Sequence, residues 1–549
     1  MKQTKLFFGL CLSAMLSAGV LAGCGGNKSG ADEYDEQGRL ILNLKNVYWE
    51  GFDGSDQYTE VLNKKFDVHV KASNYDYAEW DGMVNTAING DNLTDVFHFN
   101  LKAYNFGSTY EKWVDGQIVK ALPDDLSKWP HLNEMLSHVS NLEYLKIGEP
   151  GHKKLYGIPI MNDIVNYKKD FSNFTYIYRR DWAKKIDEDH KNVAGWKNVY
   201  KEGDVYTWDE FEYLMKAFKA YPYEGNTKLN VLVDESWGFP SVTNFYKDVP
   251  HCYVKDANGN AINAFTSDNY IKGLNKAKEY VSDKKYYAQD QYNFTANKAK
   301  EIYKGDQAAI FYDNFSLANY IALRDEMKKS HQNNLDDATA FLKVMGPDGK
   351  YALEGTENWF SMTLFNYDIS DYKMEKILDM IDYLLSEEGT RLAVYGIEGY
   401  DYNMVDGKPV LTEKGWEKDQ YGNYIAKTNG AKLLRYMATL GNDTKAEDPL
   451  TKQDAYKILS EWQDAMKKAK EDGKLRVVQE PADIDWMSTP TKNDKTESIL
   501  ADANTFVLKY AYDKGLNTLD EYKKEFDKDV SWKRILNEIN EELARRKNS

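Results

Sequence analysis

Cys24 is the cysteine whose position could support covalent chemistry. It lies in the stretch LAGCGG (21–26), behind a mostly apolar run that starts at Leu6 and follows Lys2 and Lys5. That run has roughly 15 residues, fewer than the roughly 20 that a permanent membrane helix needs. A charged start, an apolar middle and small residues at the end are typical of a secretory signal. We therefore expect this segment to be removed, with the cleavage site after the small residues Ala22 and Gly23.

The order Leu-Ala-Gly-Cys resembles the lipobox of bacterial lipoproteins, in which the acylated cysteine becomes the first residue. The alternative is an ordinary signal peptide with an incidental cysteine. Residues 24–37 are small and charged, and they predict a flexible tether that ends near Leu40. Cys11 would leave with residues 1–23, and Cys252 has no partner for a disulfide, so we expect it to be buried.

Composition limits the function classes. Cleavage would leave 526 residues, enough for at least two domains, and no later run of 18 apolar residues predicts a membrane span. Loss of Lys2 and Lys5 changes the formal charge from −16 to −18, which argues against a nucleic-acid partner. The 41 Tyr and 13 Trp supply flat apolar faces with a polar edge, which suit a ligand with alternating C–H and O–H groups, such as a sugar.

Several kinds of site are not indicated. The eight histidines are scattered, without the spacing of metal ligands, so we expect no metal or other cofactor. There is no G-x-x-x-x-G-K-[ST] phosphate loop. The stretch from Asp256 starts like a calcium loop, but Ala261 and Ser267 stand where a glycine and an acid are required. A turn between two strands is the better interpretation of residues 256–260.

The hydrophobic pattern predicts the elements that must position a site. Near the start it alternates between strand, helix, strand, helix and strand, at 39–44, 55–65, 66–70, 77–89 and 95–99. This order predicts a parallel sheet with helices on its faces, whose ligands bind beyond the carboxyl ends of the strands. Two more helices are predicted, one behind a capping box at 207–210 and an amphipathic one over 374–385.

Five segments together resemble one protein family. They are FDVHVKASNYDYAEWDGMVNTAINGDNLTDVF (66–97), YIYRRDW (176–182), TWDEFEYLMKAF (207–218), YLLSEEGTRLAVYGIEGYDYN (383–403) and TPTKNDKTESILADANTFVLKYAYDKG (489–515). In this order, behind a lipobox, they resemble the large extracellular solute-binding lipoproteins of family 1, which serve carbohydrate ABC transporters. The resemblance extends from about residue 40 to the C-terminus.

The resemblance implies a two-lobe α/β fold of the periplasmic-binding-protein type II class, which closes on a sugar or oligosaccharide in the cleft between the lobes. We expect the N-terminal lobe at 38–163 and 304–358, and the C-terminal lobe at 164–303 and 359–549. The implied partners are the ligand and an ABC permease, and the implied protein is a monomer without enzyme activity. Its lipid, a palmitate for example, would hold it on the outer face of the cell membrane, in a Gram-positive envelope.

Candidate contacts are aromatic and planar polar side chains in loops after strands, because sugars need stacking faces and bidentate hydrogen bonds. Asp313, Asn314 and Trp359 occupy places where similar family members have cleft residues. The full set of predicted ligand contacts is Trp49, Glu50, Phe99, Asn100, Asn162, Trp237, Asp313, Asn314, Trp359 and Tyr402. Met161, Asp163, Tyr400 and Trp486 are further candidates. Each of these side chains could instead serve packing or a solvated loop.

Other classes remain open. A binding protein for a peptide or another small solute would share the fold. A surface glycosidase would need two carboxylates about 5–10 Å apart, and no sequence pattern singles out such a pair among the 87 acids. A surface adhesin predicts repeats or sandwich-like strand spacing, and the sequence has neither.

Overall fold

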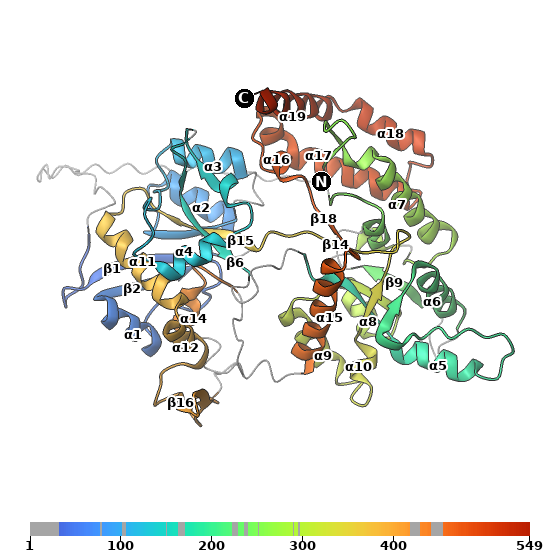
Figure 1. The fold of residues 1–549 in the computed structure, drawn as a ribbon, viewed down its shortest axis with the longest axis horizontal. Coiled ribbons are helices and arrows are strands. Elements are labelled where there is room, and N and C mark those ends of the chain that lie inside the picture. The colour runs from blue at the N-terminus through green and yellow to red at the C-terminus, as the bar shows by residue number, and fades with distance from the viewer. Residues whose placement is uncertain are drawn as a thin grey trace, which may run out of the picture.

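The computed structural model describes most of the chain. The described residues are 32–76, 79–100, 106–149, 151–162, 171–221, 229–234, 240–250, 252–288, 290–294, 297–417, 429–440 and 454–548. The signal, the lipobox with Cys24, and Trp237 lie outside these ranges. Figure 1 shows two lobes side by side, with a loop of the chain passing between β14 (Tyr351–Glu354) and β15 (Trp359–Phe365).

Lobe 1 is built on a five-stranded sheet. In spatial order its strands are β2 (Val68–Asn74), β1 (Leu40–Asn46), β3 (Val96–Phe99), β15 (Trp359–Phe365) and β6 (Gly157–Met161). β1 runs parallel to β2 and β3, as the alternating pattern predicts, whereas β15 runs antiparallel to β3 and β6. The small hairpin of β4 (Lys146–Ile147) and β5 (Lys154–Leu155) lies before β6.

Helices cover the sheet of lobe 1. They are α1 (Gln57–Phe66), α2 (Trp80–Asn89), α3 (Phe106–Asp115), α4 (Pro130–Ser137), η1 (Leu142–Leu145), α11 (Asp371–Leu385), α12 (Glu387–Tyr395) and α14 (Gly430–Arg435). The predicted amphipathic helix is confirmed as α11, whose apolar stripe is buried from Met374 to Leu384. Ser386 ends α11 and caps α12 through the N–H of Gly389, so the two helices meet at one residue.

Lobe 2 is built on a second five-stranded sheet. Its spatial order is β8 (Val205–Tyr206), β13 (Ala340–Val344), β7 (Phe174–Tyr178), β12 (Ala308–Asn314) and β9 (Asn230–Asp234). β7 runs antiparallel to both of its neighbours, and β12 runs parallel to β9. The sheet is buried between two apolar clusters.

The helices of lobe 2 come from the middle and the end of the chain. Those of the middle are α5 (Arg180–His190), η2 (Glu202–Asp204), α6 (Trp208–Ala220), η3 (Ser241–Phe245), η4 (Ala264–Thr266), α7 (Asp268–Lys278), η5 (Glu279–Asp283), η6 (Gln291–Asn293), α8 (Lys298–Lys304), α9 (Leu317–Met327) and α10 (Leu335–Ala338). Those of the end are α15 (Asp454–Glu471), α16 (Ala482–Asp485), α17 (Pro490–Ala511), α18 (Leu519–Lys528) and α19 (Val530–Asn548). The predicted capping box of α6 is confirmed, with Thr207 and Glu210 bonded reciprocally.

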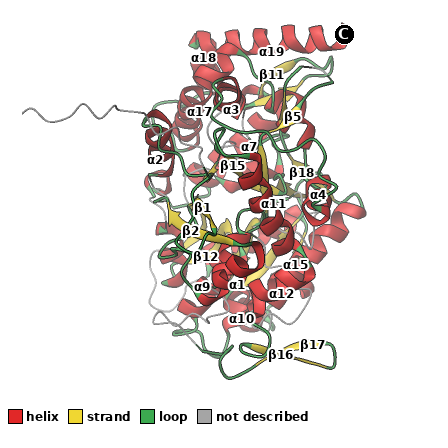
Figure 2. Cartoon of the chain, turned by 90° about the vertical axis from the view of Figure 1, so that its left-hand side faces the viewer, coloured by secondary structure: helices red, strands yellow, loops and turns green. Residues whose placement is uncertain are grey.

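Three short ladders complete the fold. β10 (Tyr253–Lys255) and β11 (Ala261–Asn263) form the predicted hairpin, and the Asp256 carboxylate of its loop accepts the N–H groups of Asn258 and Asn260. β14 (Tyr351–Glu354) pairs with β18 (Leu475–Val478) in lobe 2. β16 (Tyr402–Val405) and β17 (Lys408–Leu411) form a hairpin that projects from lobe 1 at the bottom of Figure 2, with α19 along the top.

The predicted lobe boundaries are wrong for two segments. We expected 304–358 in the N-terminal lobe, but β12 and β13 belong to the sheet of lobe 2. We expected 359–549 in the C-terminal lobe, but β15 lies between β3 and β6, and α11, α12 and α14 pack on the core of lobe 1. Strand pairing decides the lobe, and pairing over long sequence distances is not visible in a local hydrophobic pattern.

The predicted tether 24–37 is also too long. From residue 32 the chain is held on lobe 1, because Ser370 donates a hydrogen bond to Asp32, and Asp35 lies within bonding distance of Arg39 and His69. The N–H of Ile41 also donates to the carbonyl of Glu33. Among the described residues, we find no helix with the length and apolarity required to cross a bilayer.

Candidate functional site

The two sheets present their carboxyl edges to the same crossing segments. In lobe 1, β1, β2, β3 and β6 all end at the edge where β15 begins, because Trp359 pairs with Met161. In lobe 2, β9, β12 and β13 end where β7 begins, because Asn314 pairs with Phe174. Residues 162 and 440 belong to lobe 1 and residues 171 and 454 to lobe 2, and between residues 355 and 359 the chain passes from lobe 2 to lobe 1 (Figure 1). Ligands of such sheets bind beyond the carboxyl ends of the strands.

We call the residues at the carboxyl edge of each sheet the rim of that lobe. The rim of lobe 1 carries a pair of half-buried tyrosines. Tyr48 follows β1, and Tyr436 follows α14; their ring centroids lie 6.0 Å apart in an edge-on arrangement. The side chain of Asn46 accepts the N–H of Tyr48 at 3.0 Å and so fixes the turn. This geometry leaves aromatic surface at the edge, which can stack on an apolar face of a ligand.

A buried polar network lies directly beneath this rim. Nδ1 of His98 is 2.9 Å from the Asn46 amide oxygen, and Nε2 is hydrogen-bonded to the Ser361 hydroxyl, so the imidazole joins β1, β3 and β15. Burial lowers the pKa of His98 to about 3, which keeps the ring neutral. A serine, a histidine and an asparagine in this order could serve nucleophilic catalysis, but Ser361 is 0% exposed and out of reach of a substrate. The network therefore holds three strand ends together.

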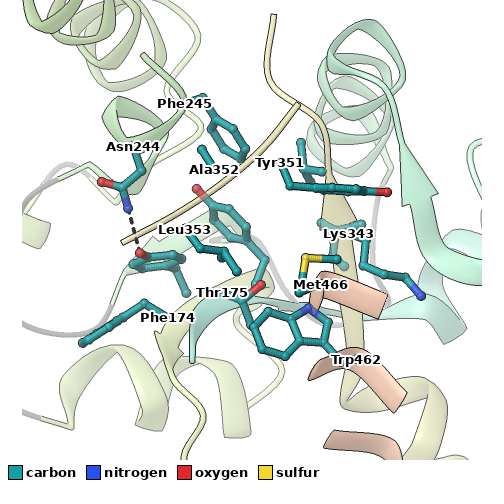
Figure 3. Close-up of a pocket in the computed structure, with 14 residues that line it drawn as sticks. Phe174, Thr175, Asn244, Phe245, Lys343, Tyr351, Ala352, Leu353, Trp462 and Met466 are labelled. Carbon is teal, nitrogen blue, oxygen red and sulfur yellow. Dashed lines mark hydrogen bonds between the residues drawn. The ribbon is translucent and has the colours of Figure 1, made fainter. Parts of the chain in front are cut away.

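The rim of lobe 2 is an aromatic cluster with one amide. Phe174 stacks on Tyr312 with centroids 6.0 Å apart, and Tyr312 lies 4.9 Å from Tyr176. The amide of Asn244 donates to the Tyr312 hydroxyl at 2.7 Å, shown by the dashed line in Figure 3. Phe245 stacks on Tyr176 with the ring planes only 6° apart. Phe174 and Tyr312 remain half-buried and so offer faces to a ligand.

A small cavity lies behind this cluster, between η3, β7, β13, β14 and α15. Tyr351, Trp462 and Lys343 line its far side in Figure 3. Its volume of about 20 Å³ is room for a single water molecule. A sugar ring does not fit there, so the ligand surface is the rim and not this cavity.

A second buried polar network supports the rim of lobe 2. Asp234, at the end of β9, is 1% exposed and accepts both the N–H and the O–H of Ser241, each at 2.7 Å. The Tyr176 hydroxyl donates to the Ser241 oxygen at 2.7 Å. Burial raises the pKa of Asp234 to about 7.

In the segment that connects β14 to β15, one residue separates the part bonded to lobe 2 from the part bonded to lobe 1. Gly355 continues the β14–β18 ladder, because its N–H donates to the carbonyl of Val478 at 2.7 Å. Two residues later, the buried carboxylate of Glu357 accepts the Ser140 hydroxyl of lobe 1 at 2.5 Å. Thr356 is therefore the residue of this crossing that neither lobe holds through the hydrogen bonds described.

The crossing is clamped to lobe 1 beyond Glu357 as well. Asn358 accepts the N–H of Ser140 at 2.9 Å and donates to the carbonyl of His138 at 2.6 Å. Asn162, at the first crossing, donates from its backbone to the carbonyl of Asn358 and from its side chain to that of Glu357. These contacts fix residues 357 and 358 to lobe 1 and leave Thr356 between the parts held by the two lobes.

The lobes touch through two tryptophans. Trp486 follows α16 of lobe 2 and stacks on Trp359 of lobe 1, with centroids 5.7 Å apart and planes at 30°. The indole N–H of Trp359 donates to the carbonyl of Ser140. A hydrogen bond of 3.2 Å from Ser488 to Glu111 on α3 lies nearby in sequence and adds a second contact.

Of the nine predicted contacts that the structure describes, five are buried and four have accessible surface. Trp49, Phe99, Trp359 and Tyr402 are buried and held by packing; the Trp49 indole N–H, for example, donates to the carbonyl of Leu433. Asn100, Asn162, Asn314 and Glu50 lie at the carboxyl edges with accessible surface. Asp313 is buried beside Asn314, and Tyr400 is exposed next to the β16–β17 hairpin.

Sequence reasoning did not select Tyr48, Tyr436, Phe174, Tyr312 or Asn244. Tyr48 is one residue from the chosen Trp49, and Tyr312 is one from the chosen Asp313. Along β12 the side chains alternate between the two faces of the sheet, so an error of one residue there exchanges a packed side chain for an accessible one. Tyr48 and Trp49 lie in the turn after β1, where this alternation does not apply. The alternation of Tyr176, Tyr178, Tyr312 and Asn314 in the sequence is the signal that could have found the cluster.

Metal binding finds no support in the part of the chain that the structure describes. No three histidine, cysteine or acidic side chains converge there as a cation site would require. Cys252 is buried, as expected, and burial raises the pKa of its thiol.

Comparison with known proteins gives the fold. No family model matches the chain. It is 22% identical over 552 residues to the polygalacturonan/rhamnogalacturonan-binding protein YtcQ of Bacillus subtilis (strain 168), with 98% of each chain covered. A solved extracellular solute-binding protein from Bifidobacterium longum subsp. infantis matches 92% of this chain and 100% of its own, with a TM-score of 0.64 at 13% identity.

A second solved structure agrees with the first. The ABC-transporter substrate binding protein FusA of S. pneumoniae, in complex with kestose, matches 93% of this chain and 100% of its own, with a TM-score of 0.57 at 16% identity. The chain therefore has the two-lobe α/β fold of extracellular solute-binding proteins. The predicted fold class is confirmed, and so is the resemblance on which it rested.

Proposed function

We propose that this chain is the substrate-binding protein of an ABC importer, which captures a saccharide between its lobes and delivers it to a permease. The observation that carries the proposal is the arrangement of the two rims. Each lies at the carboxyl edge of a sheet, both edges meet at the crossing segments, and the fold matches solved solute-binding proteins over more than nine tenths of the chain.

The side chains of the rims favour a saccharide. Tyr48 and Tyr436 on one rim, and Phe174 and Tyr312 on the other, offer aromatic faces for the C–H face of a sugar. Asn314, Asn162 and Glu50 add polar groups that can pair with hydroxyls. YtcQ is named for binding polygalacturonan and rhamnogalacturonan, and FusA is described in complex with kestose. Oligosaccharides of these two kinds are the first ligands to test.

Capture would occur by hinge closure. The hydrogen bonds that hold residues 357–358 to lobe 1 and Gly355 to lobe 2 concentrate rotation near Thr356. Closure would bring the two rims onto the ligand and remove water from their hydrogen bonds, which strengthens them.

The cellular setting follows from the N-terminal sequence. We propose that Cys24 is acylated and holds the body on the outer face of the cell membrane, as a monomer, next to the permease. The acidic body and the aromatic rims give no footprint for nucleic acid. We further propose that binding involves no catalysis, no metal and no other cofactor.

A thermal-shift screen of residues 27–549 tests the function. The panel contains kestose, oligogalacturonides, neutral mono- and oligosaccharides, and short peptides. A ligand at a hundred times its Kd adds about 2.7 kcal/mol to the free energy of unfolding, which is a clear rise in Tm. Chromatography of each ligand after incubation shows whether it stays intact.

Three results discriminate the classes. Stabilisation by an intact saccharide supports the importer and names its cargo. A cleaved saccharide would make the chain a glycosidase, and stabilisation by peptides alone would make it a peptide receptor.

A further inference from the structure

One buried acid, Asp234 at the end of β9, holds the start of η3; we call this contact the junction between β9 and η3. Both carboxylate oxygens of Asp234 accept hydrogen bonds from Ser241, the first residue of η3, and its backbone N–H donates to the side-chain oxygen of Gln291 at 3.2 Å. Val242, the next residue of η3, donates its N–H to the Tyr287 hydroxyl at 3.3 Å. The start of η3 is thus held to the sheet through side chains and not through a strand ladder.

The other end of η3 belongs to the rim of lobe 2. Asn244 fixes the hydroxyl of Tyr312, and Phe245 stacks on Tyr176, whose own hydroxyl donates to Ser241. The backbone of Tyr312 is held in the β12 ladder, and η3 adds the hydrogen bond that fixes its hydroxyl. Asp234 itself is buried behind these groups and does not reach the rim surface.

We propose that Asp234 is a positioning residue for the rim of lobe 2: through Ser241 it fixes η3 and Tyr312, and its ionisation loosens this rim. The inference deepens the proposed function and rests on it for the consequence that saccharide affinity depends on a side chain the saccharide does not touch. Packing alone would not make the position of η3 depend on the protonation of this carboxyl group.

The surroundings of Asp234 contain no compensating cation among the described residues that act on it. The titratable groups that face it are Tyr176 of β7, Tyr312 of β12, Tyr287 beside β9 and Tyr512 at the end of α17. All four are phenols whose pKa burial raises, so they stay neutral. The charged pair next to η3, Lys247 with Glu354 at 2.8 Å, is already internally neutralised.

The direction of the effect follows from linkage. The pKa of Asp234 is raised to about 7 in the closed junction, whereas a hydrated aspartate has a pKa of about 3.9. Opening of the junction therefore releases a proton between these values, and the opening equilibrium rises by about tenfold per pH unit from about pH 4 to about pH 7. Above pH 7 the carboxylate is ionised in both states, and the equilibrium no longer depends on pH.

Amide hydrogen exchange on residues 27–549 without ligand tests this directly. We expect the protection factors of the 240–246 segment, corrected for intrinsic exchange, to fall by about tenfold per unit up to pH 7 and then to level off. Below pH 7 the neutral acid carries a proton, and one of its oxygens then donates to the Ser241 oxygen where the carboxylate accepts the Ser241 O–H. Asp234→Asn mimics this neutral form, with an acceptor for the Ser241 N–H and a donor for its oxygen, and it should remove the pH dependence while preserving protection. Ser241→Ala should lower protection at every pH.

A matched control changes charge without changing the junction. Asp248 is exposed, follows η3 closely and bonds to Asn269, so Asp248→Asn should leave the pH profile of the 240–246 segment as in the wild type. The proposal is overturned if the wild-type segment shows no pH dependence between 5 and 7, or if Asp234→Asn retains it. If Asp234→Asn does not fold, the wild-type and Ser241→Ala profiles decide.

Affinity measurements separate this inference from the function itself. Calorimetry with kestose and with oligogalacturonides at pH 5.5 and 7.5 should show weaker wild-type binding at the higher pH and equal binding for Asp234→Asn. Absence of binding by both saccharides would count against the proposed cargo and would leave the exchange result to decide the role of Asp234.

Discussion

The two lobes hold the carboxyl edges of their sheets with buried groups of opposite type, a base in lobe 1 and an acid in lobe 2. Both must hold polar groups at the buried carboxyl edge of a sheet, beneath an aromatic rim. Lobe 1 uses a neutral imidazole, His98, which joins three strand ends through Asn46 and Ser361. Lobe 2 uses a carboxyl group, Asp234, which joins a strand to the short helix η3 through Ser241.

Because of this difference, pH affects the groups beneath the two rims in opposite directions. Burial disfavours the charged form of both groups, which lowers the pKa of the base His98 and raises that of the acid Asp234. The His98 network joins strand ends that also carry ladder hydrogen bonds, so their position does not depend on one side chain. In lobe 2, Phe174 and Tyr312 are held in β7 and β12, but η3 with its Asn244 depends on Ser241 and its partners.

The largest expected effect is a pair of opposite pH limbs in the free energy of unfolding. His98, with a pKa of about 3 when folded and about 6.5 when unfolded, takes up a proton on unfolding, so stability falls as pH decreases from about 6.5 to 3. Asp234 releases a proton on unfolding, so stability falls as pH increases from about 4 to 7. At its full extent the His98 limb amounts to about 5 kcal/mol and the Asp234 limb to about 4 kcal/mol.

Denaturant unfolding from pH 4 to 8 measures both limbs. In the wild type the two slopes oppose each other and largely cancel between about pH 4 and 6.5. His98→Gln should remove the acid limb and leave stability falling as pH rises from 4 to 7, whereas Asp234→Asn should remove the other limb and leave stability falling as pH decreases below 6.5. The comparison of the lobes fails if both variants change the same limb. His131, at the exposed start of α4, supplies a control whose replacement by glutamine should leave both limbs unchanged.

Removal of one aromatic side chain from either rim should have a smaller effect, and the loss of saccharide affinity shows which rim contributes more to binding. Tyr312→Ala removes a stacking face and the partner of Asn244, whereas Tyr48→Ala removes a face but leaves the His98 network in place. Truncation of an aromatic residue that anchors a ligand costs about 2 kcal/mol or more, so we expect binding weaker by about 30-fold or more, with the larger loss for Tyr312.

Calorimetry with the saccharide found in the screen gives the ranking. Tyr372 is 47% exposed at the start of α11, on the edge of lobe 1 opposite the rim, and Tyr372→Ala should bind as the wild type does. Equal affinity for the Tyr312, Tyr48 and Tyr372 variants would remove both rims from the site.

The sequence predicts the elements of the fold better than their assembly. Local periodicity and caps predict β1, α1, β2, α2 and β3, because each signal lies within a few residues. The assignment of β12 and β15 to lobes is beyond that reach. β15 pairs with β3, which lies more than 250 residues earlier, and nothing in either segment records the other.

For the candidate site, the sequence identifies the right edges but often the wrong side chains. Residues after strands were a sound choice, and Asn162 and Asn314 do lie at the carboxyl edges. The preference for large aromatic residues selected Trp49 and Trp359, which are buried because an indole removes the most apolar surface from water. Half-exposed tyrosines next to them fit a rim better, since their hydroxyls stay hydrated.

The smallest expected effect concerns the contact that joins the two lobes. Trp486→Ala removes the stack on Trp359, which is worth about 0.5 to 1.5 kcal/mol beyond area burial. Because Trp359 stays anchored to Ser140, lobe 1 keeps its structure, and the change acts on the angle between the lobes. We expect a larger radius of gyration by X-ray scattering without ligand. Trp416→Ala, at an indole 42% exposed on lobe 1, should not change it, and an unchanged radius for Trp486→Ala would show that the crossing near Thr356 sets the angle alone.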